Sequence, residues 1–139
     1  MEGDEAETEM RSATILLVED ENAIRALAGR ALRDHGYEVL EAADGLAALE
    51  VAAKHAGAID LLLTDVRMPR LDGCELRKRL RDHRPRTKVL FMSGYTGIKL
   101  EAGAPFLPKP FTPAILLHKV NELLNVEAFE KANSQRANE

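Results

Sequence analysis

An uninterrupted apolar run that ends in aspartate, proline and glycine is the feature that most constrains how this chain folds. Residues 61–73 read LLLTDVRMPRLDG. The apolar first part suits a strand buried on both faces of a parallel sheet, and the Pro and Gly that follow break the chain into a loop. Asp65 lies at this junction. Because ligands of open parallel α/β sheets bind beyond the carboxyl ends of the strands, we expect Asp65 at the edge where such a site forms.

Four further apolar runs also predict strands, and helical patterns lie between them. The five predicted strands cover residues 14–18, 37–42, 60–64, 87–93 and 106–107. Predicted helices run from an N-cap at Asn22 to about residue 35, from Gly45 to about His55, from Cys74 to about Arg84, and from a cap at Thr112 to residue 124. This alternation predicts an α/β protein with a doubly wound, five-stranded parallel sheet covered on both faces.

The segment between the fourth and fifth predicted strands is short for a crossover connection. Residues 94–105 include Gly94, Gly97, Gly103 and Pro105, which leave only residues 98–102 for a helix. A crossover between parallel strands usually needs about a dozen residues, so this one is at the lower limit. We therefore expect a shortened fourth helix and a mobile segment at residues 95–104.

Length and composition indicate one domain with polar ends. The chain has 139 residues, 45% of them apolar, and a formal net charge of −4 that would not attract nucleic acid or an anionic membrane. Its single cysteine, Cys74, is expected to be a small buried hydrophobe. With no signal peptide or long apolar stretch, the chain is expected in the cytoplasm. We expect a disordered acidic tail at 1–12, a domain at 13–124 and a polar tail at 125–139.

Polar side chains follow the strands whose carboxyl ends should meet at one edge of the sheet. They are Glu19 and Asp20, Asp65, Ser93 and Lys109. Three carboxylates in one crevice repel one another unless a cation is present, and an all-oxygen ligand set suits Mg²⁺ better than zinc. Lys109 adds a charge for a phosphoryl oxygen, and Ser93 adds a hydroxyl donor. Together these groups predict a phosphoryl-transfer site with a carboxylate nucleophile.

The chain resembles the receiver domains of two-component response regulators, both single-domain ones and those of hybrid histidine kinases. The resemblance covers roughly residues 13–124, and its matching segments are residues 15–21, 62–73, 91–95 and 107–111. It implies the flavodoxin-like strand order 2-1-3-4-5. It also implies that a histidine kinase or a histidine phosphotransfer protein phosphorylates Asp65.

The same resemblance implies a role for each residue at the strand ends. Asp20 would bind Mg²⁺ directly and Glu19 through water. Asp65 and the backbone carbonyl of Arg67 would be the other protein ligands of the ion. Lys109 would contact the phosphoryl group, aimed by a cis Lys109–Pro110 peptide bond, and Ser93 would move toward it as the switch hydroxyl. Phe106 stands where the family has a rotating aromatic, although a short fifth strand would bury an aromatic residue in any case.

Two more features have both a plain and a functional interpretation. Tyr95 is either a solvated loop residue or, together with Arg67, a group that flanks the phosphoryl site and hinders the hydrolytic water. Nine Lys and Arg residues lie between Arg67 and Lys88. They form either a solvated helix face or a docking patch for an acidic partner.

The leading function is a phosphoacceptor that switches protein–protein interactions and catalyses only its own phosphotransfer and dephosphorylation. One alternative is a receiver-like scaffold that works without phosphorylation. A Mg²⁺-dependent aspartyl phosphatase would generally need a second acid two residues after the nucleophile, where this chain has Arg67. A flavodoxin-like cofactor binder would need a phosphate-cradling turn in place of the acidic first loop. Oligomeric state, and whether the chain is free-standing or part of a hybrid kinase, stay open.

Overall fold

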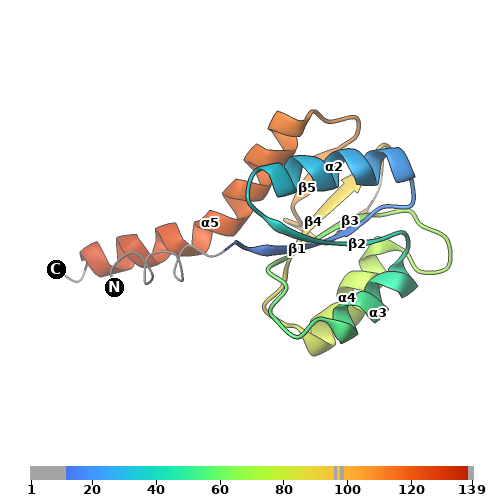
Figure 1. The fold of residues 1–139 in the computed structure, drawn as a ribbon. Helices are drawn as coiled ribbons and strands as arrows, with labels where there is room; N and C mark the ends of the chain where they lie inside the picture. Colours follow the sequence, from blue (N-terminus) through green and yellow to red (C-terminus); the bar gives the residue numbers. More distant parts are fainter. Residues whose placement is uncertain (1–11, 96, 98, 138–139) are drawn as a thin grey trace.

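A five-stranded parallel sheet forms the middle layer of the molecule (Figure 1). In the computed structural model of the chain, residues 12–95, 97 and 99–137 are described. The strands are β1 (Thr14–Val18), β2 (Glu38–Ala42), β3 (Leu61–Asp65), β4 (Lys88–Ser93) and β5 (Phe106–Pro108), in the order β2-β1-β3-β4-β5. The predicted fold class and strand order are therefore confirmed.

Two helices cover each face of the sheet, as Figure 1 shows. Helices α2 (Asn22–Asp34) and α5 (Pro113–Ala137) lie on one face, and α3 (Gly45–Lys54) and α4 (Gly73–His83) lie on the other. The two faces use alternate residues of the central strands: Leu16 and Leu62 pack toward α3 and α4, whereas Ile15 and Leu61 pack toward α2 and α5. Because β1 and β3 are buried on both faces, all ten of their residues are buried.

Short polar side chains begin three of the four helices. Asp44 accepts a hydrogen bond from Ala47 N at 2.8 Å, Asp72 accepts one from Glu75 N at 2.8 Å, and Thr112 Oγ1 accepts one from Ile115 N at 3.2 Å. The expected cap at Asn22 is wrong. Asn22 is the first residue of α2, and its side chain instead accepts a hydrogen bond from Arg25 Nη2.

The connection between β4 and β5 differs from the prediction. Residues 99–105 form neither helix nor strand, so the helix expected at 98–102 is absent from 99–102; Ile98 lies outside the described residues. Gly97 and Gly103 have φ angles of 76° and 77°, in the left-handed region. The span between them is too short to support a stable helical nucleus, and it closes instead in a turn between Ala104 N and Glu101 O at 3.1 Å.

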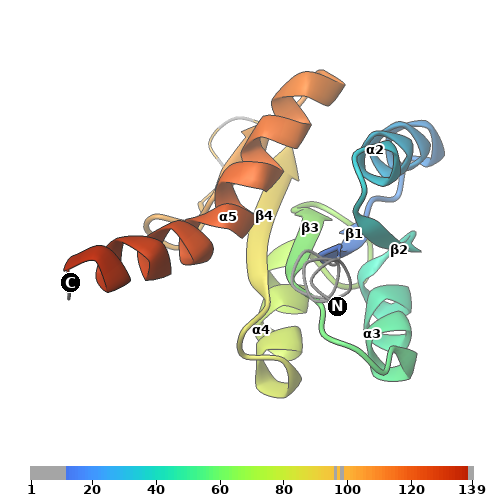
Figure 2. The ribbon, with the colours of Figure 1, turned by 60° about the vertical axis from the view of Figure 1, so that its left-hand side comes forward.

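Helix α5 is longer than the sequence suggests. It continues past residue 124 to Ala137, and in both views its last part extends away from the sheet (Figures 1 and 2). Among the described residues, no helix has the length and apolar composition needed to span a membrane. Residues 1–11 of the expected acidic tail lie outside the described residues, and the domain boundary at 124 stays a prediction. Cys74 is half-buried against the core rather than fully buried.

Candidate functional site

Three carboxylates meet at the carboxyl edge of the sheet, as the sequence predicts. Glu19 and Asp20 follow β1, and Asp65 is the last residue of β3. One carboxylate oxygen from each of the three lies within 4.8 Å of the others. Glu19 is fully buried, Asp65 is 7% exposed, and Asp20 is exposed. The cluster is therefore enclosed on the protein side and open to solvent through Asp20.

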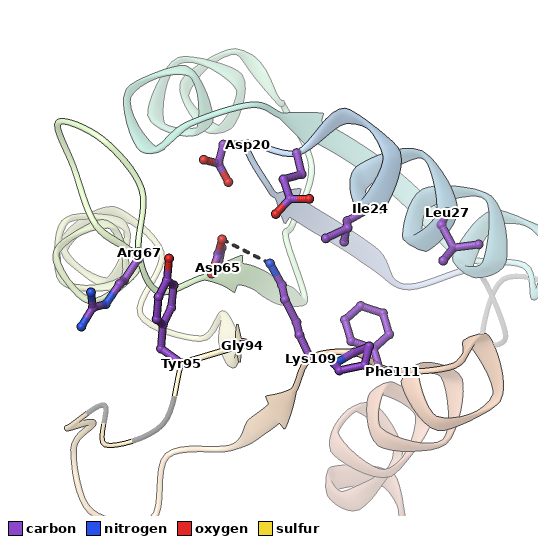
Figure 3. Close-up of a pocket in the computed structure, with 11 residues that line it drawn as sticks. Asp20, Ile24, Leu27, Asp65, Arg67, Gly94, Tyr95, Lys109 and Phe111 are labelled. Carbon is purple, nitrogen blue, oxygen red and sulfur yellow. Dashed lines mark hydrogen bonds and ion pairs between the residues drawn. The ribbon is translucent and has the colours of Figure 1, made fainter.

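Lys109 reaches this cluster from the loop after β5. Its Nζ donates to Glu19 Oε1 and, at 3.3 Å, to Asp65 Oδ2. Figure 3 shows the contact with Asp65. The peptide bond between Lys109 and Pro110 is cis, as predicted, and Lys109 N donates to the carbonyl of Ser93 at 2.9 Å. One ammonium group thus lies between two buried carboxylates that come from different strands.

Burial controls the protonation of these groups. It raises the pKa of both Glu19 and Asp65 above their ordinary values, and Lys109 opposes the shift without cancelling it. Burial alone would lower the pKa of Lys109, but its hydrogen bond to Glu19 and the charge of Asp65 outweigh that effect and raise it. Three carboxyl groups share this site with one ammonium group, so a cation would stabilise the charged forms that burial disfavours.

The backbone around Asp65 is fixed by close packing of the loop that follows it. Val66 N donates to Met92 O at 3.1 Å, and Gly73 N donates to Val66 O at 2.8 Å. Gly73 has no side chain, and its α-carbon lies so close to the carbonyl of Asp65 that no β-carbon would fit there. The loop from β3 to α4 is thereby folded back against the end of β3, which orients Asp65 toward the edge of the sheet.

A cavity of about 570 Å³ opens in front of Asp65 and Lys109. Arg67 and Tyr95 stand at one side of it, and residues of α2 and of the loop before α5 stand at the other (Figure 3). The guanidinium carbon of Arg67 lies 4.5 Å from the centroid of the Tyr95 ring. Tyr95 is 58% exposed, so this cation–π pair forms the solvent-facing rim of the cavity.

Two predicted residues lie away from this cavity. Ser93 is buried at the end of β4, and its Oγ accepts a hydrogen bond from Tyr95 N at 3.1 Å. Phe106 is half-buried and packs against the core beside α4. Both residues line a neighbouring cavity with Gly97 and residues 100–103, and Lys109 also borders it. The sequence-predicted residues are therefore divided between two adjoining spaces.

Sequence reasoning did not single out several residues of the site. Arg25 of α2 donates to the carbonyl of Glu19 at 2.7 Å and thereby holds the acidic turn after β1. Ile24, Leu27 and Phe111 form the apolar wall of the main cavity. Ile24 and Leu27 have the helical spacing of a core-facing side of a helix, but Leu27 is 49% exposed. That exposure depends on how α2 packs beside α5, which the sequence pattern does not specify.

Comparison with known proteins agrees with this geometry. The pattern of the family described as "Response regulator receiver domain" matches residues 15–121. The chain belongs to the response regulator receiver family. Receiver domains are signalling domains rather than conventional enzymes, and they work with histidine kinases or phosphotransfer proteins.

Named relatives of this receiver include whole signalling proteins and solved receiver structures. It is 44% identical over 119 residues to the sensor kinase CckA of Brucella abortus, covering 81% of this chain and 13% of that protein. It is 39% identical to the response regulator MprA of Mycobacterium leprae, covering 79% of this chain and 50% of that protein. The chain therefore spans between about an eighth and a half of the length of these two relatives.

Solved structures of single receiver domains are also similar to this chain. The receiver domain of the hybrid histidine kinase CckA is 49% identical with a TM-score of 0.72, covering 81% of this chain and 99% of that one. The chemotaxis response regulator CheY4 of Vibrio cholerae is 35% identical with the same TM-score, 0.72, and the same shares, 81% and 99%. Both match nearly their full length, so the receiver fold accounts for most of this chain.

Proposed function

We propose that Asp65 accepts a phosphoryl group from a phosphohistidine and thereby switches the contacts this receiver makes with other proteins. The observation that carries the proposal is the Asp65 carboxylate itself, which ends β3, opens onto the cavity and pairs with Lys109. In the transfer, an Asp65 oxygen bonds to phosphorus, the P–N bond to the imidazole breaks, and the released imidazole takes up a proton. The product on Asp65 is an acyl phosphate.

The acidic cluster fits a divalent cation, and we propose Mg²⁺. Glu19, Asp20 and Asp65 supply oxygen ligands close enough to share one ion, and the backbone carbonyl of Arg67 is the proposed fourth protein ligand. When bound, Mg²⁺ neutralises charge on the phosphoryl oxygens during transfer. Burial raises the pKa of Glu19 and Asp65, and a bound cation would stabilise the charged forms that burial disfavours, which supports this assignment.

Lys109 and Ser93 are proposed to hold the phosphoryl oxygens after transfer. Lys109 Nζ already contacts Asp65, so a phosphoryl group on that carboxylate would arrive within reach of the ammonium. Ser93 Oγ is engaged with Tyr95 N, and we propose that it exchanges this contact for a phosphoryl oxygen. Phe106 lines the space beside Ser93 and is proposed to shift with it.

Arg67 and Tyr95 are proposed to slow hydrolysis of the acyl phosphate. Their stacked side chains form the rim between solvent and Asp65, on the side where a hydrolytic water would approach. A bulky rim limits the positions from which water can attack in line with the scissile bond. Tyr95 is largely exposed and therefore contributes little to the core, so a role at the rim of the site accounts for its position.

The phosphodonor is proposed to be a histidine kinase or a histidine phosphotransfer protein in the cytoplasm. The similarity to the receiver region of CckA, a sensor kinase, supports a donor of this class. An aspartyl phosphatase receives no support, because Arg67 occupies the position where such an enzyme would place its second acid.

The experiment that tests the proposal is an NMR titration of the full chain with Mg²⁺ and then with beryllofluoride, which mimics a phosphoryl group on aspartate. We expect amide shifts at Asp20, Asp65, Ser93 and Lys109 in the wild type, and no beryllofluoride response in Asp65→Asn. Asp82→Asn, which changes an exposed aspartate on α4, is the matched control and should respond as the wild type does. Mg²⁺ binding without any beryllofluoride response would instead identify a phosphorylation-independent scaffold.

A further inference from the structure

Two arginines on α4 share one carboxylate from the segment between β4 and β5. Arg77 and Arg81 are one helical turn apart, and both contact Oε1 of Glu101. The contact from Arg77 is made by Nη1, and Arg81 Nη2 lies 3.5 Å from the same oxygen. A carboxylate that is distant in sequence therefore bridges two guanidinium groups on the surface of the helix.

The arginine pair needs an anion at this position. Like charges four residues apart on a helix repel each other, and burial followed by the charge of Arg81 lowers the pKa of Arg77. Lys78 and Arg79 add further positive charge to α4. Glu75, an acid on the same helix, is already paired with Arg79 at 3.5 Å. Glu101 thus supplies negative charge that the helix itself does not place between Arg77 and Arg81.

The Glu101 carboxylate can leave this position without breaking regular secondary structure. Its side chain is 53% exposed and that of Arg81 is 50% exposed, so solvent screens the pair and weakens it. Glu101 also lies in a stretch, 99–105, that is neither helix nor strand. Leu100 packs against the core, which anchors the chain beside Glu101 while the carboxylate exchanges.

We propose that Arg77 and Arg81 form a docking site for an acidic peptide segment of a partner protein, and that Glu101 occupies this site as an internal competitor. The site lies on α4 and holds a carboxylate in this structure, so a glutamate or aspartate side chain of a partner satisfies the same two guanidinium groups. A nucleic acid fits less well, because the net charge of the chain is −4 and the exposed Asp82 flanks the pair.

A direct test measures how tightly the full chain binds a short fluorescein-labelled peptide of alternating glutamate and glycine, by fluorescence anisotropy at low salt. Removing the competitor in Glu101→Gln should tighten binding about fivefold, the effect of losing one exposed ion pair. Adding Arg81→Gln to Glu101→Gln should return the affinity to the wild-type value or below. Arg81 is half-exposed, so this variant leaves the core packing intact, and thermal unfolding checks that it is folded.

The matched control is Glu75→Gln, which removes the same charge from the same surface and frees Arg79 instead of the proposed pair. Its affinity for the peptide should stay within about twofold of the wild type. Equal tightening in Glu75→Gln and Glu101→Gln would overturn the proposal, because net charge alone would then explain binding. Unchanged affinity in Glu101→Gln would also overturn it. Glu101→Gln could also be tested with an oligothymidylate of equal length. If its affinity for the oligothymidylate rose more than its affinity for the peptide, the choice of an acidic peptide as partner would be overturned.

Discussion

A β-carbon added at Gly73 would lie 2.2 Å from the carbonyl oxygen of Asp65. The first residue of α4 and the last residue of β3 therefore approach so closely that only glycine fits. Gly73→Ala must push the loop away from the end of β3, and we expect a loss of about 1–3 kcal/mol in the free energy of unfolding. Urea denaturation of the metal-free chain measures this change.

Gly29→Ala is a suitable comparison for that substitution. Gly29 lies inside α2, where a β-carbon would come within 3.1 Å of the Glu41 carboxylate and 3.3 Å of Arg33 Nη1, both at the ends of flexible side chains. Alanine also favours the helix by about 1 kcal/mol over glycine, so Gly29→Ala should be clearly less destabilising than Gly73→Ala. If both variants lost a similar amount of unfolding free energy, the short distance between Gly73 and the carbonyl of Asp65 would not be what excludes a side chain at residue 73.

The charge on Asp65 should destabilise the metal-free fold at neutral pH. Burial raises the pKa of this carboxyl in the folded state, so the folded chain holds the proton more tightly than the unfolded chain. Stability then falls as the pH rises from the unfolded-state pKa through the folded one. We expect Asp65→Asn to be more stable than the wild type at neutral pH by on the order of 1 kcal/mol, and to lose this advantage below about pH 4.

Urea denaturation at neutral pH and below about pH 4, with and without Mg²⁺, measures the difference in stability between Asp65→Asn and the wild type. Mg²⁺ should stabilise the wild type and leave Asp65→Asn nearly unchanged, because a ligand stabilises only the state that binds it. Asp34→Asn, at an exposed residue of α2, should change stability by less than about 0.5 kcal/mol at either pH. A destabilised Asp65→Asn at neutral pH without metal would contradict the prediction.

The sheet and the acidic site could be predicted because both depend on local sequence signals. Apolar runs identify the strands, the polar residue after each strand identifies the binding edge, and parallel pairing brings Glu19, Asp65 and Lys109 together. The acidic cluster and its lysine follow from these signals because every strand ends at the same edge, whereas the support that Arg25 gives to Glu19 does not.

Features that depend on how separate elements meet could not be predicted. The apolar wall formed by Leu27, the pairing of Glu101 with α4 and the continuation of α5 to Ala137 each depend on tertiary contacts or on the absence of a clear stop signal. The helix expected at 98–102 is absent from its described part, 99–102, because Gly97 and Gly103 adopt left-handed geometry, although the residue types between them permit a helix.

Tyr95 should lengthen the lifetime of a phosphoryl group on Asp65. Removing its ring in Tyr95→Ala leaves Arg67 without its stacking partner at the rim of the cavity, and we expect phosphoryl loss to accelerate by about threefold. Tyr95→Phe retains the ring and should keep the wild-type rate. Intact-mass spectrometry after loading with a small phosphodonor measures the lifetime, and an unchanged rate in Tyr95→Ala would refute the proposed role.

Residues 99–104 should exchange their amide protons much faster than the neighbouring helix α4. This segment has no helical or strand hydrogen bonding, whereas Leu76 and Leu80 of α4 are buried against the sheet. We expect exchange to be roughly two orders of magnitude faster in the segment than at Leu80. Hydrogen exchange followed by NMR gives both rates in one sample, and strong protection at residues 99–104 would show that tertiary packing alone holds the segment rigid.

Arg84 should be among the most important charged residues for stability, although its place in a basic run suggests only a solvated surface. Its Nη1 donates to Gly57 O at 2.8 Å, and its Nη2 donates to Ala52 O at 2.9 Å and to His55 O at 2.8 Å. The guanidinium thus satisfies carbonyl groups at the end of α3 and joins α3 to the end of α4.

Truncation in Arg84→Ala should lower the free energy of unfolding by about 2 kcal/mol, since three carbonyl groups lose a charged donor. Arg84→Lys should recover only part of this loss, because one ammonium group does not reproduce the planar fork that spans the three acceptors. Arg86→Ala, at an exposed position two residues away, should stay within about 0.5 kcal/mol of the wild type. Equal effects of Arg84→Ala and Arg86→Ala in urea denaturation would show that the bonds to α3 add no stability beyond that of a solvated arginine.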